Sequence, residues 1–594
     1  AALAVTSLIL GLFSVATGRP FGEQSKVASA AGAPTTLGRK FSFIFPPNLV
    51  AGNLYVYVSS GRAGTGTWRV GSGATTNFSF SANTATTLTI TAGSAIGSAG
   101  LATSTVTGKR VEITTSVDAS VYADSNATTS SDATSVIPDA NLGTYYRILA
   151  PKHGTAGPGR TNILAIEAGT TVTITPKTTV SGKTAGTPFS VSLNAGDTYT
   201  LATTTSGEDT SGSIVSSNKP VAVFASNDCT NGSGTGEFPY NTRNQYGYCD
   251  VLFEQIPPVQ SWGRQFILNP FADRKQGGTP VRVVADQNNT VVSVNGSAVA
   301  TLQAGEVFER NYWESATATN VSINTGILLT STKPVLVSVY MRGGGSFLGQ
   351  TGDPALAFIP PFEQFLTSYT VVSAPGNTAQ LMNLMVPTTS TSSVRYDGRA
   401  LIASDFENSW AAVSGSTYSV AQIKSTQGSH TLTADQAFGL VVYGANSANS
   451  YAYVGGMSLS SIGLVDSVTM TTQAGYTGSV GQQVCLSAVI LDANGAGLVG
   501  VRVDGSVTGA NAGAVLVGTS DASGTAQLCY TASTAGTDNV VLTSNQLTAT
   551  TSVTWTEVAP SISYNPSNVS VVNGTAMPSL LPTNAGSPAS SWSV

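Results

Sequence analysis

The stretch SSNKPVAVFASNDCTN runs from Ser216 to Asn231, and a similar stretch, TSTKPVLVSVYMRGGG, runs from Thr330 to Gly345. Both place Lys-Pro before an apolar run that ends in a polar, Gly-bearing segment. Weaker versions are TSVDASVYADSN (Thr115–Asn126) and TADQAFGLVVYGAN (Thr433–Asn446). Aligning Ala119, Pro220, Pro334 and Ala437 gives spacings of 101, 114 and 103 residues. The stretch is therefore one copy of a repeat that occurs four times.

Two further landmarks keep a similar period. An aromatic or apolar run ending in Pro occurs at Pro47, Pro151, Pro270 and Pro375, and a Gly-led turn into an alternating run occurs at Gly196, Gly305 and Gly415. Units of about 105 residues with several alternating strands are typical of β-sandwiches. Lys-Pro is absent from the first and fourth versions, so we interpret the repeated strand as scaffold, with Pro as its first residue.

The predicted fold class is all-β, with four tandem β-sandwich units followed by Ig-like sandwich modules. Pro-containing joints recur at VIPD (Val136–Asp139), QIPP (Gln255–Pro258) and FIPP (Phe358–Pro361), and they predict a compact or semi-rigid array. A different strand-rich pattern starts near Ser467. The predicted regions are a signal-peptide-like segment at 1–30, sandwich units at 38–140, 141–257, 258–361 and 362–463, an Ig-like domain at 467–556 and a truncated Ig-like or cadherin-like module at 557–594.

Composition excludes one class of function and indicates export. Charged residues make up 10% of the 594 residues, against roughly 25% in ordinary domains, and the net charge is −5 without a basic stripe. A nucleic-acid binder is therefore excluded, because phosphates need clustered Lys and Arg. The first seventeen residues are uncharged and are typical of a secretory signal, with a short membrane anchor as the alternative. We expect a secreted or cell-surface protein with no other membrane contact, unless an anchor lies outside this sequence.

The cysteines agree with export, and no pattern predicts catalysis. Cys229 and Cys249 lie in one segment and Cys485 and Cys529 in another, which predicts two local disulfides. Each cysteine of the second pair lies in an alternating strand, as an inter-sheet disulfide requires. The two histidines are far apart, and neither has the context of a catalytic triad or a zinc site. We expect no catalytic residues, no metal and no cofactor, and a protein that is not an enzyme.

The order of YYRILAP, NKPVAVFASNDC, SWGRQFILNP, TKPVLVSVYMRG, GDPALAFIPPFEQFL and GSHTLTADQAFGLVVYG resembles the IgGFc-binding N-terminal domain family over about Gly38 to Ile462. That family occurs in a mucus-associated animal protein and in bacterial surface proteins. The resemblance implies that Cys229 and Cys249 form a family loop disulfide. The segment around Cys485 and Cys529 is similar to bacterial Ig-like domains of the invasin and intimin type, and the mosaic implies a bacterial exported protein.

Long polar connections follow the repeated strands and are rich in Tyr, Asn, Ser and Gly, a composition typical of binding loops. The alternative is that their tyrosines pack over the joints between sandwiches. The candidate ligand-loop residues are Asn227, Asp228, Tyr240, Arg243, Tyr246, Tyr248, Arg342, Tyr451 and Tyr453. The leading hypothesis is an adhesin or ligand-binding protein for a glycan, a mucin or another glycoprotein. The alternatives are a structural envelope or matrix spacer and the non-catalytic front of a longer enzyme.

Overall fold

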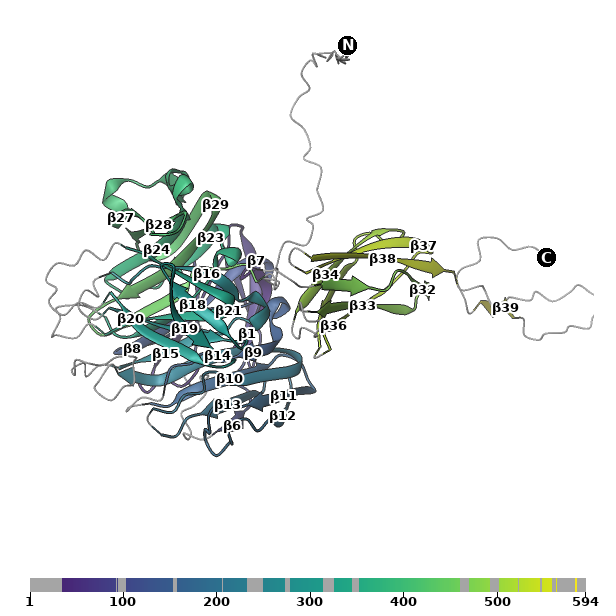
Figure 1. Ribbon diagram of the computed structural model, residues 1–594, viewed down its shortest axis with the longest axis horizontal. Helices are drawn as coiled ribbons and strands as arrows, with labels where there is room; N and C mark the ends of the chain where they lie inside the picture. The colour runs from purple at the N-terminus through teal and green to yellow at the C-terminus, as the bar shows by residue number, and fades with distance from the viewer. Residues whose placement is uncertain are drawn as a thin grey trace, which may run out of the picture. The chain divides into compact units, whose positions relative to one another are not determined.

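The described part of the computed structural model is built almost entirely of β-strands (Figure 1). It comprises residues 35–91, 93, 103–152, 157–205, 207–231, 249–272, 278–313, 325–343, 352–459, 469–491, 501–521, 523–544, 547–557, 562–563 and 583–584. The all-β fold class is confirmed. The predicted signal segment at 1–30 lies outside the described residues. Within the described ranges, no helix is long and apolar enough to cross a bilayer.

Residues 38–255 form the first two of four large sheets. Sheet 1 consists of β1 (Gly38–Phe43), β2 (Gly52–Ser59), β3 (Gly64–Val70), β4 (Thr76–Phe80), β5 (Thr86–Ile90), β7 (Val111–Ala127) and β8 (Ser130–Ser135). Sheet 2 consists of β9 (Gly143–Arg147), β10 (Gly159–Ala165), β11 (Thr170–Thr175), β12 (Phe189–Leu193), β13 (Thr198–Ala202), β14 (Ile214–Asn231), β15 (Cys249–Gln255) and β6 (Ser104–Val106). Strand β6 precedes β7 in the sequence but pairs with β13. The first unit of the chain therefore contributes one strand to sheet 2.

The next two sheets repeat this plan. Sheet 3 consists of β16 (Gly263–Leu268), β17 (Thr279–Ala285), β18 (Thr290–Val294), β19 (Ser297–Leu302), β20 (Val307–Tyr312), β21 (Ile327–Met341) and β22 (Ala355–Ile359). Sheet 4 consists of β23 (Leu366–Ser373), β24 (Ala379–Pro387), β25 (Arg395–Tyr396), β26 (Arg399–Ala400), β27 (Phe406–Ala412), β28 (Tyr418–Lys424), β29 (Gly428–Ala445) and β30 (Ser450–Val454). Short 3-10 helices are η2 (Asp139–Asn141), η3 (Val259–Ser261), η4 (Phe362–Gln364), η5 (Thr388–Ser393) and η6 (Ala403–Asp405).

One long strand organises each sheet: β7, β14, β21 and β29 have 17, 18, 15 and 18 residues. The N-terminal half of each pairs with two strands, and its C-terminal half pairs with two others. In β14, for example, the first half lies between β9 and β11 and the second half between β10 and β15. A single strand therefore supplies both ladders of each sandwich-like unit.

The Lys-Pro pair lies in the middle of this long strand, so the prediction that Pro is the first strand residue is wrong. The register of β14 with β9 shifts between Ser216 and Val221, and Pro220 fits this shift because it has no N–H to donate. Ser217 Oγ donates to the Lys219 carbonyl at 2.6 Å, and Lys219 Nζ donates to the carbonyl of Ala168 at 2.7 Å. The repeated stretch therefore encodes a bend and its supports.

The residues paired across each bend show that the sequence alignment of the first repeat is shifted by one residue. The strand that faces each bend pairs Gly38 with Ala119, Gly143 with Val221, Gly263 with Val335 and Leu366 with Phe438. Asp118, and not Ala119, is therefore the counterpart of Pro220. A Cβ added at any of the three glycines would lie less than 3.0 Å from a joint proline, Pro138, Pro258 or Pro361. Glycine at these places lets each joint pack directly on the backbone.

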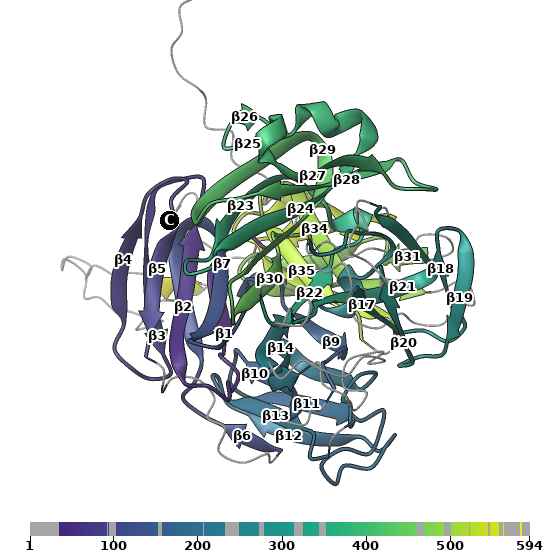
Figure 2. The same cartoon turned by 90° about the vertical axis from the view of Figure 1, so that its left-hand side faces the viewer.

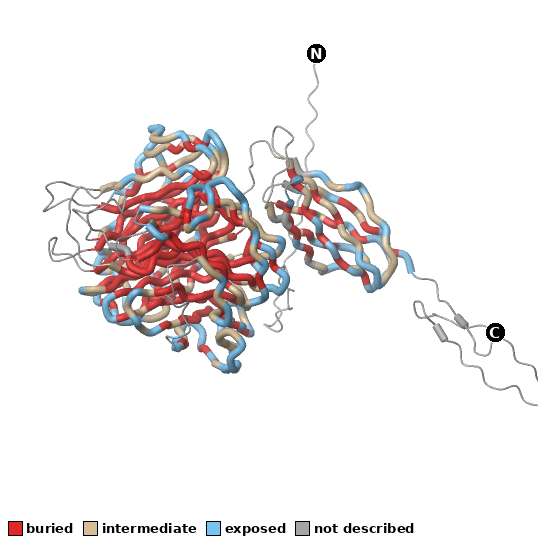
Figure 3. Tube along the Cα trace, turned by 90° about the horizontal axis from the view of Figure 1, so that it is seen from below, coloured by how far each residue is buried: buried red, intermediate tan, exposed pale blue. Residues whose placement is uncertain are grey.

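The four sheets form a closed ring, residues 35–459, around strands β8, β15, β22 and β30 (Figure 2). Strand β8 lies against β15 and β30, and β22 lies against the same two strands. These four inner strands are almost completely buried. Figure 3 shows that buried residues dominate the interior of the described chain and exposed residues its margins. In sheet 1 the strands run outward from the axis in the order β8, β7, β2 and β5.

Side-chain bonds to backbone groups connect the inner strands, which form no ladder with one another within the described residues. Asp132 on β8 accepts backbone N–H groups from Ala133 at 3.0 Å, Phe253 on β15 at 3.2 Å and Ala452 on β30 at 3.3 Å. The N–H of Leu356 on β22 also bonds to this carboxyl group. One buried carboxyl group thus contacts the backbone of all four inner strands.

The ring closes between sheets 4 and 1. Thr36 N donates to the carbonyl of Met457 at 2.9 Å, and Met457 N donates to Thr36 Oγ1 at 3.1 Å. Tyr122 on β7 is fully buried, and its hydroxyl bonds to the carbonyls of Thr370 at 3.0 Å and Gly455 at 2.9 Å. Its ring centroid lies 4.5 Å from that of Tyr453. The last sheet is therefore joined to the first through both backbone and side chains.

Residues 469–556 form a separate two-sheet sandwich. One sheet contains β31 (Thr469–Thr472), β33 (Gln483–Leu491) and β36 (Thr525–Thr531). The other contains β32 (Tyr476–Ser479), β38 (Leu547–Thr556), β37 (Gly536–Ser544), β34 (Arg502–Gly509) and β35 (Val515–Thr519). Two short strands, β39 (Ile562–Ser563) and β40 (Thr583–Asn584), pair further on.

The second disulfide is present, but it does not connect two sheets. Cys485 and Cys529 are bonded and are direct cross-strand partners of β33 and β36 in one sheet. The predicted inter-sheet arrangement is therefore wrong. The two sheets are instead joined through Asp538 on β37, which is fully buried and accepts the hydroxyl of Tyr530 on β36 at 3.0 Å as well as Trp555 Nε1 at 2.9 Å.

Tyr122→Phe tests the closing contact between sheets 4 and 1. Loss of the hydroxyl removes the donor shared by the buried carbonyl of Gly455 and the partly buried carbonyl of Thr370, so we expect the free energy of unfolding to fall by about 1–3 kcal/mol. Urea unfolding of the full chain, with hydrogen exchange of peptides from β7 and β30, measures it. Tyr199→Phe is the matched control, since Tyr199 is also a buried residue but no hydrogen bond of its hydroxyl to the described residues is present. Equal stability of both variants would contradict this account of ring closure.

Candidate functional site

The inner strands begin close together at one end of the ring, where Ser131 N donates to Asp250 Oδ1 and Asp353 N donates to Ser450 Oγ. They follow β7, β14, β21 and β29, whose C-terminal halves pair with β8, β15, β22 and β30. Of the nine candidate ligand-loop residues, Tyr240, Arg243, Tyr246 and Tyr248 lie outside the described residues. The other five are described, and the structure places all five in buried positions: Asn227, Asp228, Arg342, Tyr451 and Tyr453.

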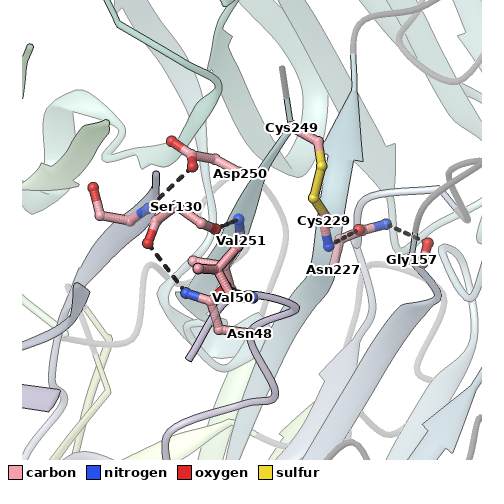
Figure 4. The surroundings of a disulfide bond; sticks show 10 residues. Asn48, Val50, Ser130, Gly157, Asn227, Cys229, Cys249, Asp250 and Val251 are labelled. Carbon is pink, nitrogen blue, oxygen red and sulfur yellow. Dashed lines mark hydrogen bonds between the residues drawn. A yellow bond between two sulfur atoms is a disulfide. The ribbon is translucent and has the colours of Figure 1, made fainter. Parts of the chain in front are cut away.

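Asn227 supports the end of β14 next to the first disulfide (Figure 4). Its side-chain amide donates to the carbonyl of Lys152 at 2.8 Å and to that of Gly157 at 3.3 Å, and its Oδ1 accepts the N–H of Cys229 at 2.9 Å. Cys229 is bonded to Cys249, as predicted. Asn227 is completely buried, so it orders the base of the connection instead of facing a ligand.

Asp228 forms a buried ion pair with Arg160. Arg160 Nε lies 2.6 Å from Asp228 Oδ1, and Arg160 Nη2 lies 2.8 Å from Asp228 Oδ2. The two side chains are 3% and 7% exposed, so water screens this pair little. A bidentate pair of this kind holds β10 against β14 and is not available to bind a ligand.

The two candidate tyrosines of β30 are packing residues. The Tyr451 hydroxyl donates to Gln380 Oε1 at 2.5 Å and accepts the N–H of Ala374 at 3.0 Å. The Tyr453 hydroxyl bonds to the carbonyl of Val372, and burial raises the pKa of both phenols. Arg342 is also buried, at 8% exposure. The alternative that these tyrosines pack within the scaffold therefore describes them better than a binding role.

The structure shows a surface hollow that the sequence pattern did not single out. It lies on sheet 1, has a volume of about 490 Å³ and is lined by residues of β3, β4 and β7. Strand register places Thr67 beside both Asn77 and Thr114, which are exposed. The lining includes hydroxyl, amide and aromatic side chains and no charged residue: Thr65, Thr67, Asn77, Phe78, Thr114 and Ser116. Such a surface suits a neutral, hydroxyl-bearing ligand.

Catalytic or metal-binding chemistry gains no support from the described residues. They contain no group of three or more His, Cys, Asp or Glu side chains able to hold a metal ion. His430 Nδ1 lies 2.8 Å from Asp397 Oδ2, and its Nε2 lies 2.8 Å from the carbonyl of Thr426. Both ring nitrogens are thus engaged within sheet 4. This histidine holds the β25–β26 hairpin to β29.

Asp228→Asn tests whether Asp228 is structural. The substitution leaves the Arg160 charge buried without its counter-charge, so we expect the free energy of unfolding to fall by about 3 kcal/mol or more. The control is Asp118→Asn, which removes the pair between Arg39 and Asp118, whose side chains are 59% and 61% exposed. That change should cost less than about 1 kcal/mol. Urea unfolding of both full-length variants measures the difference, and a stable Asp228→Asn protein would contradict the structural role.

Comparisons with known proteins bear directly on the ring. The family model described as IgGFc binding protein matches residues 132–444, more than half of the chain. The human IgGFc-binding protein is 29% identical over 328 residues, which are 53% of this chain but 5% of the human protein. A solved biofilm-associated protein BSP domain covers 58% of this chain and 94% of its own, with 10% identity and a TM-score of 0.13, too low to bear on the fold. From the family match, this chain belongs to the IgGFc binding protein family.

Proposed function

We propose that this chain is the ligand-binding part of an exported bacterial surface protein, an adhesin that binds a glycan, a mucin or another glycoprotein through its ring. The observation that carries the proposal is membership of a family whose human member is named for binding IgG Fc. The chain spans only 5% of that human protein, so Fc binding comes to this chain as a hypothesis to be tested.

Two features support an extracellular binding role. Both disulfides are formed, and disulfides persist in oxidising compartments outside the cytoplasm. The ring is a closed scaffold that orders its core by buried hydrogen bonds, and rigid scaffolds commonly present binding surfaces on their loops and faces. The separate sandwich at 469–556 fits a stalk module of the bacterial Ig-like kind within this proposal.

The hollow on sheet 1 is the contact surface that we propose for a neutral glycan. Thr67, Asn77 and Thr114 present hydroxyl and amide groups that can both donate and accept hydrogen bonds. The lining itself carries no charged residue, and beside it Glu112 pairs with both Arg69 at 2.8 Å and Arg110 at 3.2 Å.

A structural spacer is the second candidate function. It is favoured by the burial of Asn227, Asp228, Arg342, Tyr451 and Tyr453, which removes the described ligand-loop candidates from the accessible surface. The spacer would need no ligand, and the hollow would then be an ordinary feature of a twisted sheet. An enzyme remains a proposal only for a longer protein in which this chain is a non-catalytic part.

Binding of the full chain to a glycan array, purified mucin and IgG Fc tests the adhesin proposal. We expect saturable binding to neutral glycans or mucin, and we expect Asn77→Arg to weaken it about tenfold or more, because a long charged side chain fills the hollow. Surface plasmon resonance measures both affinities.

The matched control is Thr301→Arg, an exposed substitution on β19, the counterpart of β4 in sheet 3. It should leave binding unchanged. Binding that Asn77→Arg does not affect would move the contact away from the hollow and keep the adhesin function. Absence of saturable binding to all three ligands would contradict the adhesin proposal and favour the spacer.

A further inference from the structure

Carboxyl groups gather at the axis of the ring, where no described function uses them. Asp132 lies on β8, Asp250 and Glu254 lie on β15, and Asp353 directly precedes β22. Their exposures are 0%, 0%, 2% and 2%. A carboxylate loses a large hydration energy when it is buried, so each group needs hydrogen-bond donors, a cation or a proton.

Asp132 has hydrogen-bond donors on both of its oxygens, although burial still raises the pKa of this carboxyl group well above its ordinary value. Its two oxygens accept N–H groups of Ala133, Phe253 and Ala452, and Leu356 N–H bonds to the same carboxyl group. Backbone N–H groups stabilise the ionised form of a carboxyl group. This residue therefore serves as the connector of the four inner strands.

Asp250 and Glu254 are compensated on one oxygen only. Asp250 Oδ1 accepts the N–H of Ser131 at 3.0 Å, a bond drawn in Figure 4, whereas Asp250 Oδ2 is buried without a hydrogen-bond partner among the described residues. Glu254 Oε2 accepts the hydroxyl of Thr134 at 2.6 Å, whereas Glu254 Oε1 is likewise buried and unpartnered in the described structure. Each side chain thus has one oxygen that nothing described stabilises in the ionised form.

Neighbouring negative charges further disfavour the ionised forms of Asp250 and Glu254. Asp250 is repelled by Asp353 and Asp132, and Glu254 is repelled by Asp132. Strand β30 carries no titratable side chains other than the phenols of Tyr451 and Tyr453. On β14, which pairs with β15, Asp228 is already paired with Arg160. Arg342, which follows β21, has interactions of its own. No described cluster of ligands could hold a metal ion here.

We propose that Asp250 and Glu254 form a proton-binding site at the axis, so that the ring is tightest when both carboxyl groups are protonated and loosens when they ionise. A proton on the unpartnered oxygen removes the buried charge and the repulsion from Asp132 and Asp353. Because these side chains connect β15 to β8, their ionisation acts directly on the contacts that hold neighbouring sheets together.

The sign of the pH dependence follows from the proton affinities. Burial raises the pKa of Asp250 and of Glu254 well above the ordinary value, so the folded ring binds these protons more tightly than the unfolded chain does. Stability is then highest below about pH 4, where both states are protonated, and it falls as pH rises toward the raised values. Asp124, whose pKa burial raises to about 6, adds a slope of the same sign in the lower part of this range.

Denaturation of the full chain in urea from about pH 5 to about pH 9, followed by pulsed hydrogen exchange at one fixed pH, tests the proposal. Peptides from β8, β15, β22 and β30 report on the ring separately from the sandwich at 469–556. We expect the unfolding equilibrium constant of the wild-type ring to rise on the order of tenfold or more across this range. Asp250→Asn and Glu254→Gln imitate the protonated groups, so each should flatten this dependence and be more stable than wild type at the alkaline end.

The control is Asp132→Asn, which places an amide N–H₂ against backbone N–H donors. It should lower ring stability already at the acidic end of the range, where Asp250→Asn and Glu254→Gln should leave the ring about as stable as wild type. Because burial also raises the pKa of Asp132, this variant should flatten the slope in part. A wild-type ring whose stability does not change with pH, or Asp250 and Glu254 variants that keep the full slope, would overturn the proposal. Restoration of the wild-type ring at alkaline pH by millimolar Ca²⁺, absent in both variants, would also overturn it by assigning the site to a metal cation.

Discussion

The carboxyl group of Asp132 is the contact on which the ring depends most. Four sheets can surround an axis only if their innermost strands satisfy their backbone groups without pairing as a ladder, because buried N–H groups cannot be left without acceptors. Asp132 offers two oxygens to N–H groups from β8, β15, β22 and β30 at once. It is also the first residue matched by the family model, although the ring itself begins at sheet 1.

A second constraint operates within each sheet. The long strand has to leave one ladder and enter another, and at that point its backbone changes register. Pro220 and Pro334 suit the change because they have no N–H, and Ser217 and Ser331 bond to the carbonyl two residues ahead. In β7 Thr115 makes the same hydroxyl bond, to the carbonyl of Val117, but Asp118 and Ala437 replace the proline in β7 and β29. The feature common to all four bends is therefore the register shift.

The burial of polar side chains separates scaffold from contact surface. Asn227, Asp228 and Tyr451 have the composition of a binding loop, yet each is bonded inside the ring. A buried polar group whose hydrogen bonds are all made within the protein contributes to the specificity of the fold, and it has no donor or acceptor left for a ligand. Among the described residues, the hollow of sheet 1 is the surface that we propose for recognition.

The repeat, the strand-rich composition and the cysteine pairs were predictable from the amino-acid sequence, since each depends on residues that are close along the chain. Alternation of apolar and polar residues reports the two faces of a strand, and the order of several such strands indicates the family. The joint prolines were visible for the same reason.

Closure of the ring was not predictable, because its contacts join residues that are far apart and have ordinary polarity. Asp132 and Ala452 are 320 residues apart, and neither carries a pattern that points to the other. The pairing of Cys485 with Cys529 was predictable, but its position within one sheet was not, because that position depends on the register of β33 against β36. Local periodicity identifies which residues are buried, whereas the tertiary structure selects which buried groups meet, since hydrogen bonds and desolvation depend on distances that only the folded chain defines.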